Sequence, residues 1–231
     1  MNKVLYIILI SLFSLTVISC SEDKEESTTD TTTTTTTTTS SPLFVAVGDN
    51  GTILTSTDGT TWDNRSYETP SRLRAITYAN STFMTVGYLD EIILSSSDGI
   101  TWDNKRSGTG NLRGVAYGDD KFVVVGLSGH ISTSSDGTSW DNRTSGTTKE
   151  LYGVNYINNQ FVAVGDNGTI LTSSDAISWD NRTIAGQSNY LYHVAYGNNK
   201  YVAVGGNGWI VTSSDGISWD NASSGTNSFL S

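Results

Sequence analysis

The sequence predicts an all-β protein built from one repeated unit, and three observations carry that prediction. First, a stretch of the form FVAVGDNGTILTSSDAISWDN, most complete at residues 161–181, occurs five times. Second, successive copies start 39, 39, 39 and 40 residues apart, at Phe44, Phe83, Phe122, Phe161 and Tyr201. Third, the chain contains only two Pro, which leaves strand hydrogen bonding uninterrupted. A fixed period of this size is typical of stacked supersecondary units.

The copy at residues 112–146 indicates how each unit divides into strands. Its apolar patterning predicts four strands, at residues 112–117, 122–126, 131–134 and 139–143. Two copies join the second and third strands by Gly-Asp-Asn-Gly, as at residues 165–168, and tight Asn-Gly turns connect antiparallel strands, whereas a parallel β-helix needs crossovers. Four short antiparallel strands form the blade of a β-propeller. Residues 43–231 are therefore predicted to be a five-bladed β-propeller.

The two ends of the repeat region predict how the ring closes. The chain enters the first unit at Leu43, in second-strand sequence, with no strand like LRGVAY before it. It ends in SGTNSFL at residues 224–230, which aligns with SGTGNL at residues 107–112. We therefore expect the C-terminal residues to supply the first strand of the first blade and to remove exposed strand edges. An incomplete ring, or a fragment, is the alternative.

The first 42 residues predict export and attachment to a membrane. Lys3 precedes an apolar run at residues 4–18, the order of a signal peptide, and this run is too short for a good membrane span. The residues Val-Ile-Ser-Cys at 17–20 resemble the lipobox of bacterial lipoproteins, which implies that residues 1–19 are removed and that Cys20 carries lipid. Residues 20–42 are acidic and then almost pure Thr. Such a segment has too little apolar surface to fold, so we expect a disordered tether.

Charge and composition limit the partners. A formal net charge of −10 argues against nucleic acid, which binds clustered Lys and Arg. The two His, His130 and His193, lie in different repeats without ligand-spaced neighbours, so we expect no metal and no cofactor. Acidic residues directly after Cys20 are similar to sorting signals of some surface-exposed Gram-negative lipoproteins. The expected location is the cell envelope, at the outer membrane, with membrane contact through the lipid.

The turn before the fourth strand resembles a known motif. The five heptapeptides read STDGTTW, SSDGITW, SSDGTSW, SSDAISW and SSDGISW, and they look like a shortened Asp-box of BNR-repeat propellers, a superfamily that includes sialidases. The resemblance implies a structural role, in which the Asp accepts backbone N–H bonds and the Trp packs beneath it. The residues concerned are Asp58, Trp62, Asp98, Trp102, Asp136, Trp140, Asp175, Trp179, Asp215 and Trp219.

A binding site is expected where the first strands meet. One position of these innermost strands carries Arg74, Arg113, Tyr152 and Tyr192. Two guanidiniums and two phenols that converge on the central channel suit a carboxylate or a sugar; the alternative is that they fill a narrow channel. The loops at this end of the blades also vary most between copies, at residues 65–72, 88–91, 105–111, 127–129, 143–150 and 182–190, as at a binding face.

The function that these features favour is non-catalytic binding of a protein or a glycan. A sialidase-like glycoside hydrolase is the enzymatic alternative, but it needs three clamping Arg, a Tyr–Glu pair and an acid. The candidates for the clamp and the Glu are Arg72, Arg74, Arg113, Glu68, Glu91 and Glu150. None of these Glu is paired by sequence with a Tyr on a strand, and no spacing singles out two carboxylates. Photosystem II assembly-factor-like propellers have similar repeats and imply a chaperone-like role.

Overall fold

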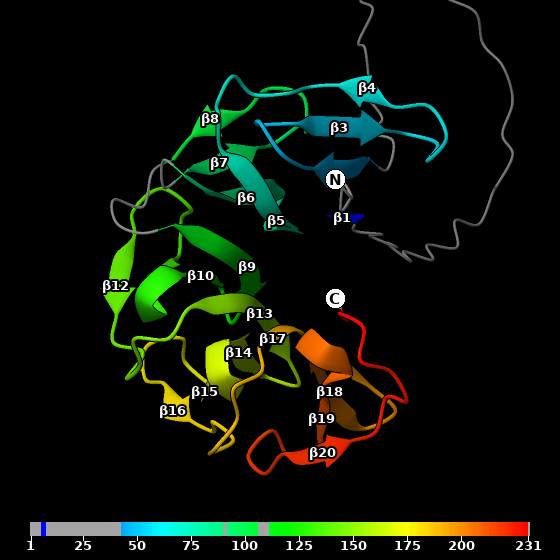
Figure 1. Ribbon diagram of the computed structural model, residues 1–231. Helices are drawn as coiled ribbons and strands as arrows, with labels where there is room; N and C mark the ends of the chain where they lie inside the picture. The colour runs from blue at the N-terminus through cyan, green and yellow to red at the C-terminus, as the bar shows by residue number, and fades with distance from the viewer. Residues whose placement is uncertain (1–5, 8–42, 90–91, 106–110, 231) are drawn as a thin grey trace, which may run out of the picture.

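The computed structural model describes residues 6–7, 43–89, 92–105 and 111–230 of the protein. These residues form five four-stranded antiparallel sheets. The sheets follow one another around an arc, with one strand of each at the centre and one at the periphery (Figure 1). This arrangement confirms the predicted fold class, an all-β propeller with five blades.

Each blade is a simple up-and-down sheet in chain order. Blade 1 contains β1 (Tyr6–Ile7), β2 (Phe44–Val47), β3 (Ile53–Ser56) and β4 (Asp63–Asn64). Blade 2 contains β5 (Arg72–Ala79), β6 (Thr82–Tyr88), β7 (Ile93–Ser96) and β8 (Asp103–Asn104). Blade 3 contains β9 (Leu112–Gly118), β10 (Lys121–Gly126), β11 (Ile131–Ser134) and β12 (Asp141–Arg143). Blade 4 contains β13 (Leu151–Ile157), β14 (Gln160–Gly165), β15 (Ile170–Ser173) and β16 (Asp180–Asn181). Blade 5 contains β17 (Leu191–Gly197), β18 (Lys200–Gly205), β19 (Ile210–Ser213) and β20 (Asp220–Ala222).

Short 3-10 turns join the second and third strands of the last three blades. They are η1 (Leu127–Gly129), η2 (Asp166–Gly168) and η3 (Gly206–Gly208). In η2 the predicted Asn-Gly turn places Asn167 at φ 53° and Gly168 at φ 68°, the left-handed region that these two residue types adopt most readily. Because consecutive strands are antiparallel, these turns and the loops that enter each blade lie at the same end of the propeller.

Apolar side chains fill the spaces between neighbouring blades. Four buried clusters join blade 1 to 2, 2 to 3, 3 to 4 and 4 to 5. In blade 4, for example, Phe161 and Leu171 pack toward blade 3, whereas Val162 and Ile170 pack toward blade 5. Both faces of a central strand are therefore buried, which explains why the second strand of each repeat is apolar throughout.

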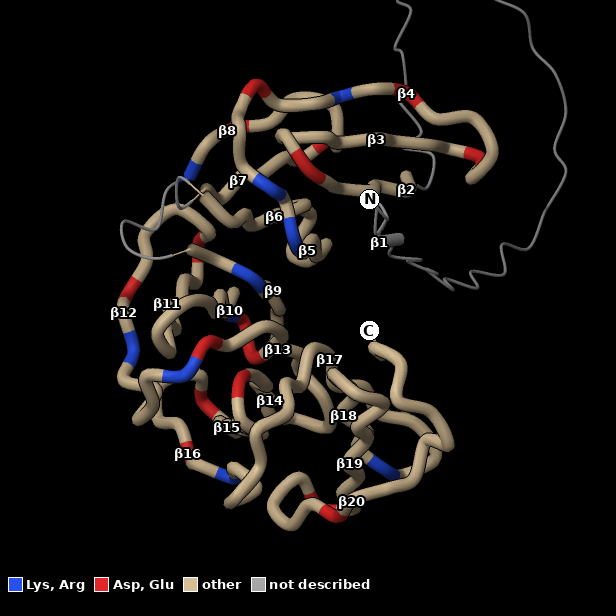
Figure 2. The backbone as a smooth tube through the Cα atoms, viewed as in Figure 1, with Lys and Arg blue, Asp and Glu red and all other residues tan. Residues whose placement is uncertain are grey.

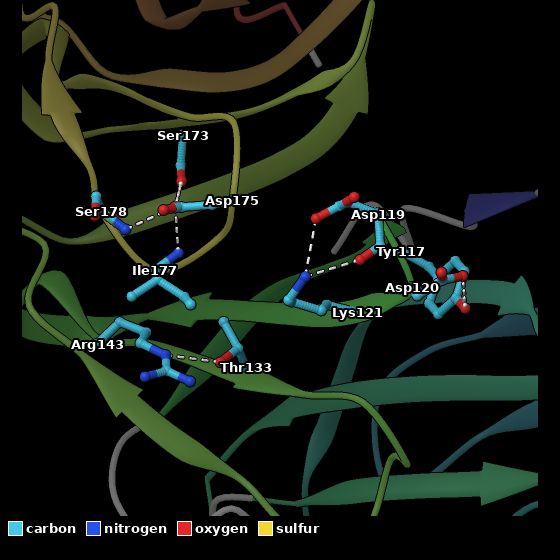
Figure 3. Close-up of polar contacts among 10 residues, drawn as sticks. All are labelled: Tyr117, Asp119, Asp120, Lys121, Thr133, Arg143, Ser173, Asp175, Ile177 and Ser178. Atoms are coloured by element: carbon cyan, nitrogen blue, oxygen red, sulfur yellow. Dashed lines mark hydrogen bonds and ion pairs between the residues drawn. The ribbon is translucent and has the colours of Figure 1, made fainter.

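The other end of the propeller is built from the five Ser-x-Asp heptapeptides, which we call the Asp turns. One carboxylate oxygen of each Asp accepts two backbone N–H bonds at 2.7–2.9 Å and a Ser hydroxyl at 2.9–3.0 Å. Figure 3 shows this arrangement at Asp175, with Ser173, Ile177 and Ser178 around the carboxylate. These bonds hold the pKa of every one of the five carboxyls below its usual range, to about 2 for Asp175.

The same bonds shorten the last strand of each blade. The sequence predicts the fourth strand of blade 3 from residue 139, but β12 begins at Asp141. The N–H of Ser139 donates to Asp136 instead of entering the strand ladder, and Trp140 closes the turn. Arg143, at the end of β12, donates from Nε to the Thr133 hydroxyl of β11 (Figure 3).

The strand that completes blade 1 is not the predicted one. We expected residues 227–231 to pair with β2, but the strand in that place is β1, with Tyr6 opposite Val47 and Ile7 opposite Ala46. Residues 223–230 form no strand. The tail stays on blade 5, where the N–H of Leu230 donates to the carbonyl oxygen of Gly205 at 3.0 Å.

The predictions for the N-terminal region fall mostly beyond the described residues. The cleavage site, Cys20 and the tether at residues 20–42 are all in the undescribed range 8–42. Within the parts of the chain that the structure describes, no helix is long and apolar enough to cross a membrane.

Candidate functional site

A cavity of about 430 Å³ lies where the innermost strands of blades 2 to 5 converge. Its walls come from β5, β9, β13 and β17, and include Arg74, Arg113, Tyr152 and His193. Three of the four residues predicted for a binding site therefore line one cavity. Figure 2 shows the basic residues of β5 and β9 close to the centre of the arc. The fourth predicted residue, Tyr192, packs against Tyr152 with ring centroids 5.0 Å apart.

Arg113 is fixed by contacts with two neighbouring blades. Its Nε donates to Oε1 of Glu150 at 2.7 Å, and both side chains are largely buried. Its guanidinium carbon also lies 4.2 Å from the ring centroid of Tyr88 and 5.7 Å from that of Tyr152. Cation–π contact and a charge-assisted hydrogen bond both hold a guanidinium in place. Arg113 is thus already paired, and its main effect is to order the rim of the cavity.

Tyr152 is held on the same rim by a contact within blade 4. Its hydroxyl donates to Oδ1 of Asp166, in η2, at 2.6 Å. Burial, the hydrogen bond to Asp166 and the nearby charge of Glu150 raise the pKa of Tyr152 well above its ordinary value. The phenol therefore stays protonated and serves as a hydrogen-bond donor.

Aromatic rings continue from this rim toward blade 5. Tyr192 packs on Tyr152 and on Phe229, whose ring centroid lies 4.5 Å away. Tyr190 contacts both tyrosines at 6.1–6.2 Å between centroids. Tyr190 is 44% exposed and Phe229 is 58% exposed. We call Tyr88, Tyr152, Tyr190, Tyr192 and Phe229 the aromatic rim.

Arg74 differs from Arg113 because it has an unused donor. Its Nε is buried and has no hydrogen-bond partner, although the side chain lines the cavity. Arg65 and Trp140 also have a buried nitrogen without a partner, but neither lines this cavity. A buried donor left unsatisfied costs about 1–3 kcal/mol, so a ligand that supplies an acceptor at Arg74 would recover that free energy.

Several residues of this site were not predicted from the sequence. Glu150 and Asp166 pair with predicted residues that lie 37 and 14 positions away, and sequence spacing gives no signal for such pairs. Tyr88, Glu150 and Tyr190 do lie in the loops identified as variable. Phe229 was assigned to a closing strand, so its contact with Tyr192 was not expected.

In the structure, the candidate residues do not form the active site of a sialidase. Arg72 and Glu68 are exposed, Arg113 is occupied by Glu150, and Glu91 lies outside the described residues. The raised pKa of Tyr152 is opposite to what a nucleophilic phenolate requires. Within the described ranges, no three His, Cys, Asp or Glu side chains gather in a way that would hold a metal ion.

A larger depression, of about 720 Å³, lies on blade 3 between η1 and the chain after β12. It is shallow, and its charged lining residue, Arg143, already pairs with Asp141 at 3.0 Å. His130 also lines it and contacts the Ser132 hydroxyl at 2.9 Å. This depression offers no unused charged group, so the central cavity is the better candidate site.

Comparison with solved structures supports the β-propeller fold. No protein-family model and no curated protein sequence matches this chain. Solved β-propellers do resemble it in structure. YCF48 from Cyanidioschyzon merolae is 18% identical with a TM-score of 0.62, and the match covers 82% of this chain and 71% of that one. Virginiamycin B lyase from Staphylococcus aureus is 10% identical with a TM-score of 0.71, over 80% of this chain and 68% of that one. The WD40 β-propeller domain of Doa1 is 14% identical with a TM-score of 0.64, over 81% and 66%.

The protein is therefore a β-propeller with five blades in the described residues. At these identities the likeness concerns the fold alone. One of the similar structures is a lyase, so the fold by itself does not decide between an enzyme and a binding protein.

Proposed function

We propose that this propeller is a non-catalytic binding module that takes an extended, carboxylate-bearing segment of a partner protein at the central cavity. The observation that carries the proposal is the unsatisfied buried Nε of Arg74 in a cavity bordered by the aromatic rim. A carboxylate is the acceptor that matches a guanidinium in charge and geometry. Exposed aromatic side chains next to it supply apolar contact area at low entropic cost.

The packing of the rim favours a peptide over a glycan. Sugars bind aromatic residues by lying flat on an open ring face. Here Tyr192 has Tyr152 and Phe229 packed against it at 5.0 and 4.5 Å, and Arg113 lies over Tyr88. Tyr190 and Phe229 remain about half exposed, at 44% and 58%, which suits contact with apolar side chains of a peptide. A chaperone-like role, implied by the resemblance to assembly-factor-like propellers, would be one form of such binding.

Selection from a displayed random-peptide library tests the class of ligand. The full chain is immobilised, and enriched peptides are synthesised and tested for competition with one another. We expect Asp or Glu to be enriched together with apolar residues, and binding to weaken when the carboxylates are converted to amides. A glycan array and a panel of fluorogenic sialosides are run in parallel. Saturable glycan binding without peptide enrichment, or turnover of a glycoside, would overturn the proposal.

We further propose that residues 1–19, and β1 (Tyr6–Ile7) with them, are removed, and that lipid on Cys20 then holds the propeller at an envelope membrane, at the outer membrane and facing outward. The support is the lipobox-like sequence Val-Ile-Ser-Cys and the polar tether at residues 20–42. Several acyl chains on one residue give stable attachment, whereas one chain alone binds reversibly.

Membrane fractionation tests the anchor independently of ligand binding. The full chain and its Cys20→Ala variant are expressed in a bacterium with a labelled fatty acid, and Ser21→Ala serves as the matched control. We expect label and membrane association for the unchanged chain and for Ser21→Ala, and neither for Cys20→Ala. Protease treatment of intact cells then reports the orientation. Unlabelled Cys20 in a membrane-free protein would refute the anchor and leave the peptide proposal untouched.

A further inference from the structure

The four residues predicted for a binding site are each the extra residue of a β-bulge. In blades 2 to 5, the pairing of the first strand with the second shifts by one residue near the cavity end. The residue left unpaired is Arg74 in β5, Arg113 in β9, Tyr152 in β13 and Tyr192 in β17. A β-bulge re-aims a side chain and is common beside functional sites. The same local device therefore sets the direction of all four side chains.

The charges around the cavity are separated by blade. Arg74 lies on blade 2 and Arg113 on blade 3, whereas Glu150 and Asp166, the carboxylates that bond to cavity residues, belong to blade 4. In Figure 1, β9 lies between β5 and β13. Arg113 and Glu150 neutralise each other in their ion pair, and desolvation lowers the pKa of His193, so that it is neutral near pH 7. A positive charge at Arg74 and a negative charge at Asp166 remain.

Asp166 carries a charge that no cation of the described residues balances. None of the ion pairs in those ranges includes Asp166, and its side-chain partner is the neutral phenol of Tyr152. Its charge reaches the aromatic rim: burial raises the pKa of Tyr192 most, and the nearby Tyr190 and the charge of Asp166 raise it further. A ligand cation beside Asp166 would therefore gain a Coulomb attraction that no side chain already satisfies.

An aromatic side chain lies next to this carboxylate. Tyr190 and Asp166 both contact Tyr152, Tyr190 at 6.2 Å between ring centroids and Asp166 through the hydroxyl. Tyr190 is 44% exposed. A Lys or Arg side chain is attracted to the face of a Tyr ring within about 6 Å of its centroid. The blade 4 side of the rim thus suits a cation, as the blade 2 side suits a carboxylate.

We propose that the partner segment carries a Lys or Arg side chain close to its carboxylate, with the carboxylate at Arg74 and the cation at Asp166 and Tyr190. The inference rests on the proposed peptide-binding function and adds a second charge to the ligand, which is then zwitterionic and not simply acidic. Two opposite charges on different blades also set the direction of the segment across the cavity. The reversed segment would bring like charges together, which opposes binding.

Synthetic peptides with acetylated and amidated ends test the second charge. Each contains one Glu and one Lys separated by a variable number of uncharged residues, so that these two side chains carry the only charges. Affinity for the full chain in mild detergent is measured by titration calorimetry. At the best spacing, we expect the peptide to bind about fivefold or more tightly than its counterpart with norleucine in place of Lys. A second Glu in that place should weaken binding further, because Asp166 repels it.

The variant Asp166→Asn completes the comparison. Asparagine keeps an acceptor for the Tyr152 hydroxyl but removes the charge. Asp49→Asn is the matched control, because Asp49 lies in the same Gly-Asp-Asn-Gly sequence of blade 1 and is exposed. We expect Asp166→Asn to abolish the preference for Lys over norleucine and to leave the requirement for the peptide's Glu unchanged. Asp49→Asn should change neither.

This inference and the proposed function fail in different ways. Equal affinity of the Lys and norleucine peptides for the unchanged protein, with the Glu still required, overturns the second charge and leaves carboxylate binding intact. That comparison needs no variant, so it holds however Asp166→Asn folds. A preference for Lys that persists in a folded Asp166→Asn also overturns the inference, because the cation then binds elsewhere. Absence of binding at every spacing overturns the proposed function and this inference with it.

Discussion

The guanidinium of Arg113 and the carboxylate of Glu150 form an ion pair at 2.7 Å that ties the first strand of blade 3 to the loop entering blade 4. The pair lies at the rim of the central cavity, and both side chains are mostly buried, with 22% and 14% of their surfaces exposed. Blade packing and the candidate site are therefore linked through these two residues.

Breaking this pair should destabilise the protein. Glu150→Ala leaves the Arg113 charge without its acceptor, which we expect to cost about 1–3 kcal/mol. The measurement is urea unfolding of Glu150→Ala, Arg113→Ala and the double variant. We expect the double variant to lose less than the sum of the two single losses, because the interaction is counted in both. Strictly additive losses would show that the two side chains act independently.

The Asp turns should make stability depend on acid pH. Their carboxyl pKa values are lower in the folded protein than the ordinary 3.8, chiefly because backbone N–H groups two and three residues on bind the carboxylate. A lowered folded pKa stabilises the protein above the unfolded pKa, and this contribution is lost as the pH falls through the folded value. For Asp175 the window runs from about pH 3.8 down to about 2.

Thermal unfolding between pH 6 and pH 2 measures this dependence. We expect the melting temperature to fall steeply below pH 4, and Asp175→Asn to be less stable at pH 6 but less sensitive to acid. Asp220→Asn is a control on an exposed Asp outside the turns. An acid transition of the same size in Asp175→Asn would mean that other groups cause it.

Two Trp of the Asp turns should differ in their tolerance of Phe. Both are partly buried, but the Nε1 of Trp179 donates to the Ala176 carbonyl at 3.2 Å, whereas the buried Nε1 of Trp140 has no partner. Replacing Trp179 removes a hydrogen bond and replacing Trp140 removes an unsatisfied donor. We expect Trp179→Phe to cost about 1 kcal/mol more than Trp140→Phe in urea unfolding. Equal costs would indicate that indole packing alone matters.

Gly205 should tolerate no side chain, although its φ of −168° is open to any residue. A Cβ at Gly205 would lie 1.7 Å from the carbonyl oxygen of Tyr190, so the backbone entering blade 5 would have to move. We expect Gly205→Ala to lose about 2 kcal/mol or more. Gly197→Ala is the control, since a Cβ there meets nothing within 4 Å. Similar melting temperatures for the two variants would contradict this close approach.

The repeat made the blades predictable from the sequence, because the second, third and fourth strands and the Asp turns occur five times in register, and the first strand occurs four times. The alternation of side chains along a strand also placed Arg74, Arg113 and Tyr152 at one cavity. The pairing of Arg113 with Glu150 was not predictable, because it depends on how adjacent blades approach one another. The predicted closing strand was wrong for a related reason: the sequence alignment does not show that the tail stays on blade 5, where the N–H of Leu230 donates to the carbonyl oxygen of Gly205, while β1 pairs with β2.

The most direct test of the central claim is the affinity of a selected acidic peptide for the Arg74→Gln variant, measured by fluorescence anisotropy. Lys200→Gln, which makes the same change in charge at the exposed start of β18, at the opposite end of the propeller, is the control. If a carboxylate of the partner pairs with Arg74, Arg74→Gln should weaken binding about tenfold or more, and Lys200→Gln should leave the dissociation constant unchanged. Equal affinity of Arg74→Gln and the unchanged protein for every selected peptide would contradict the account.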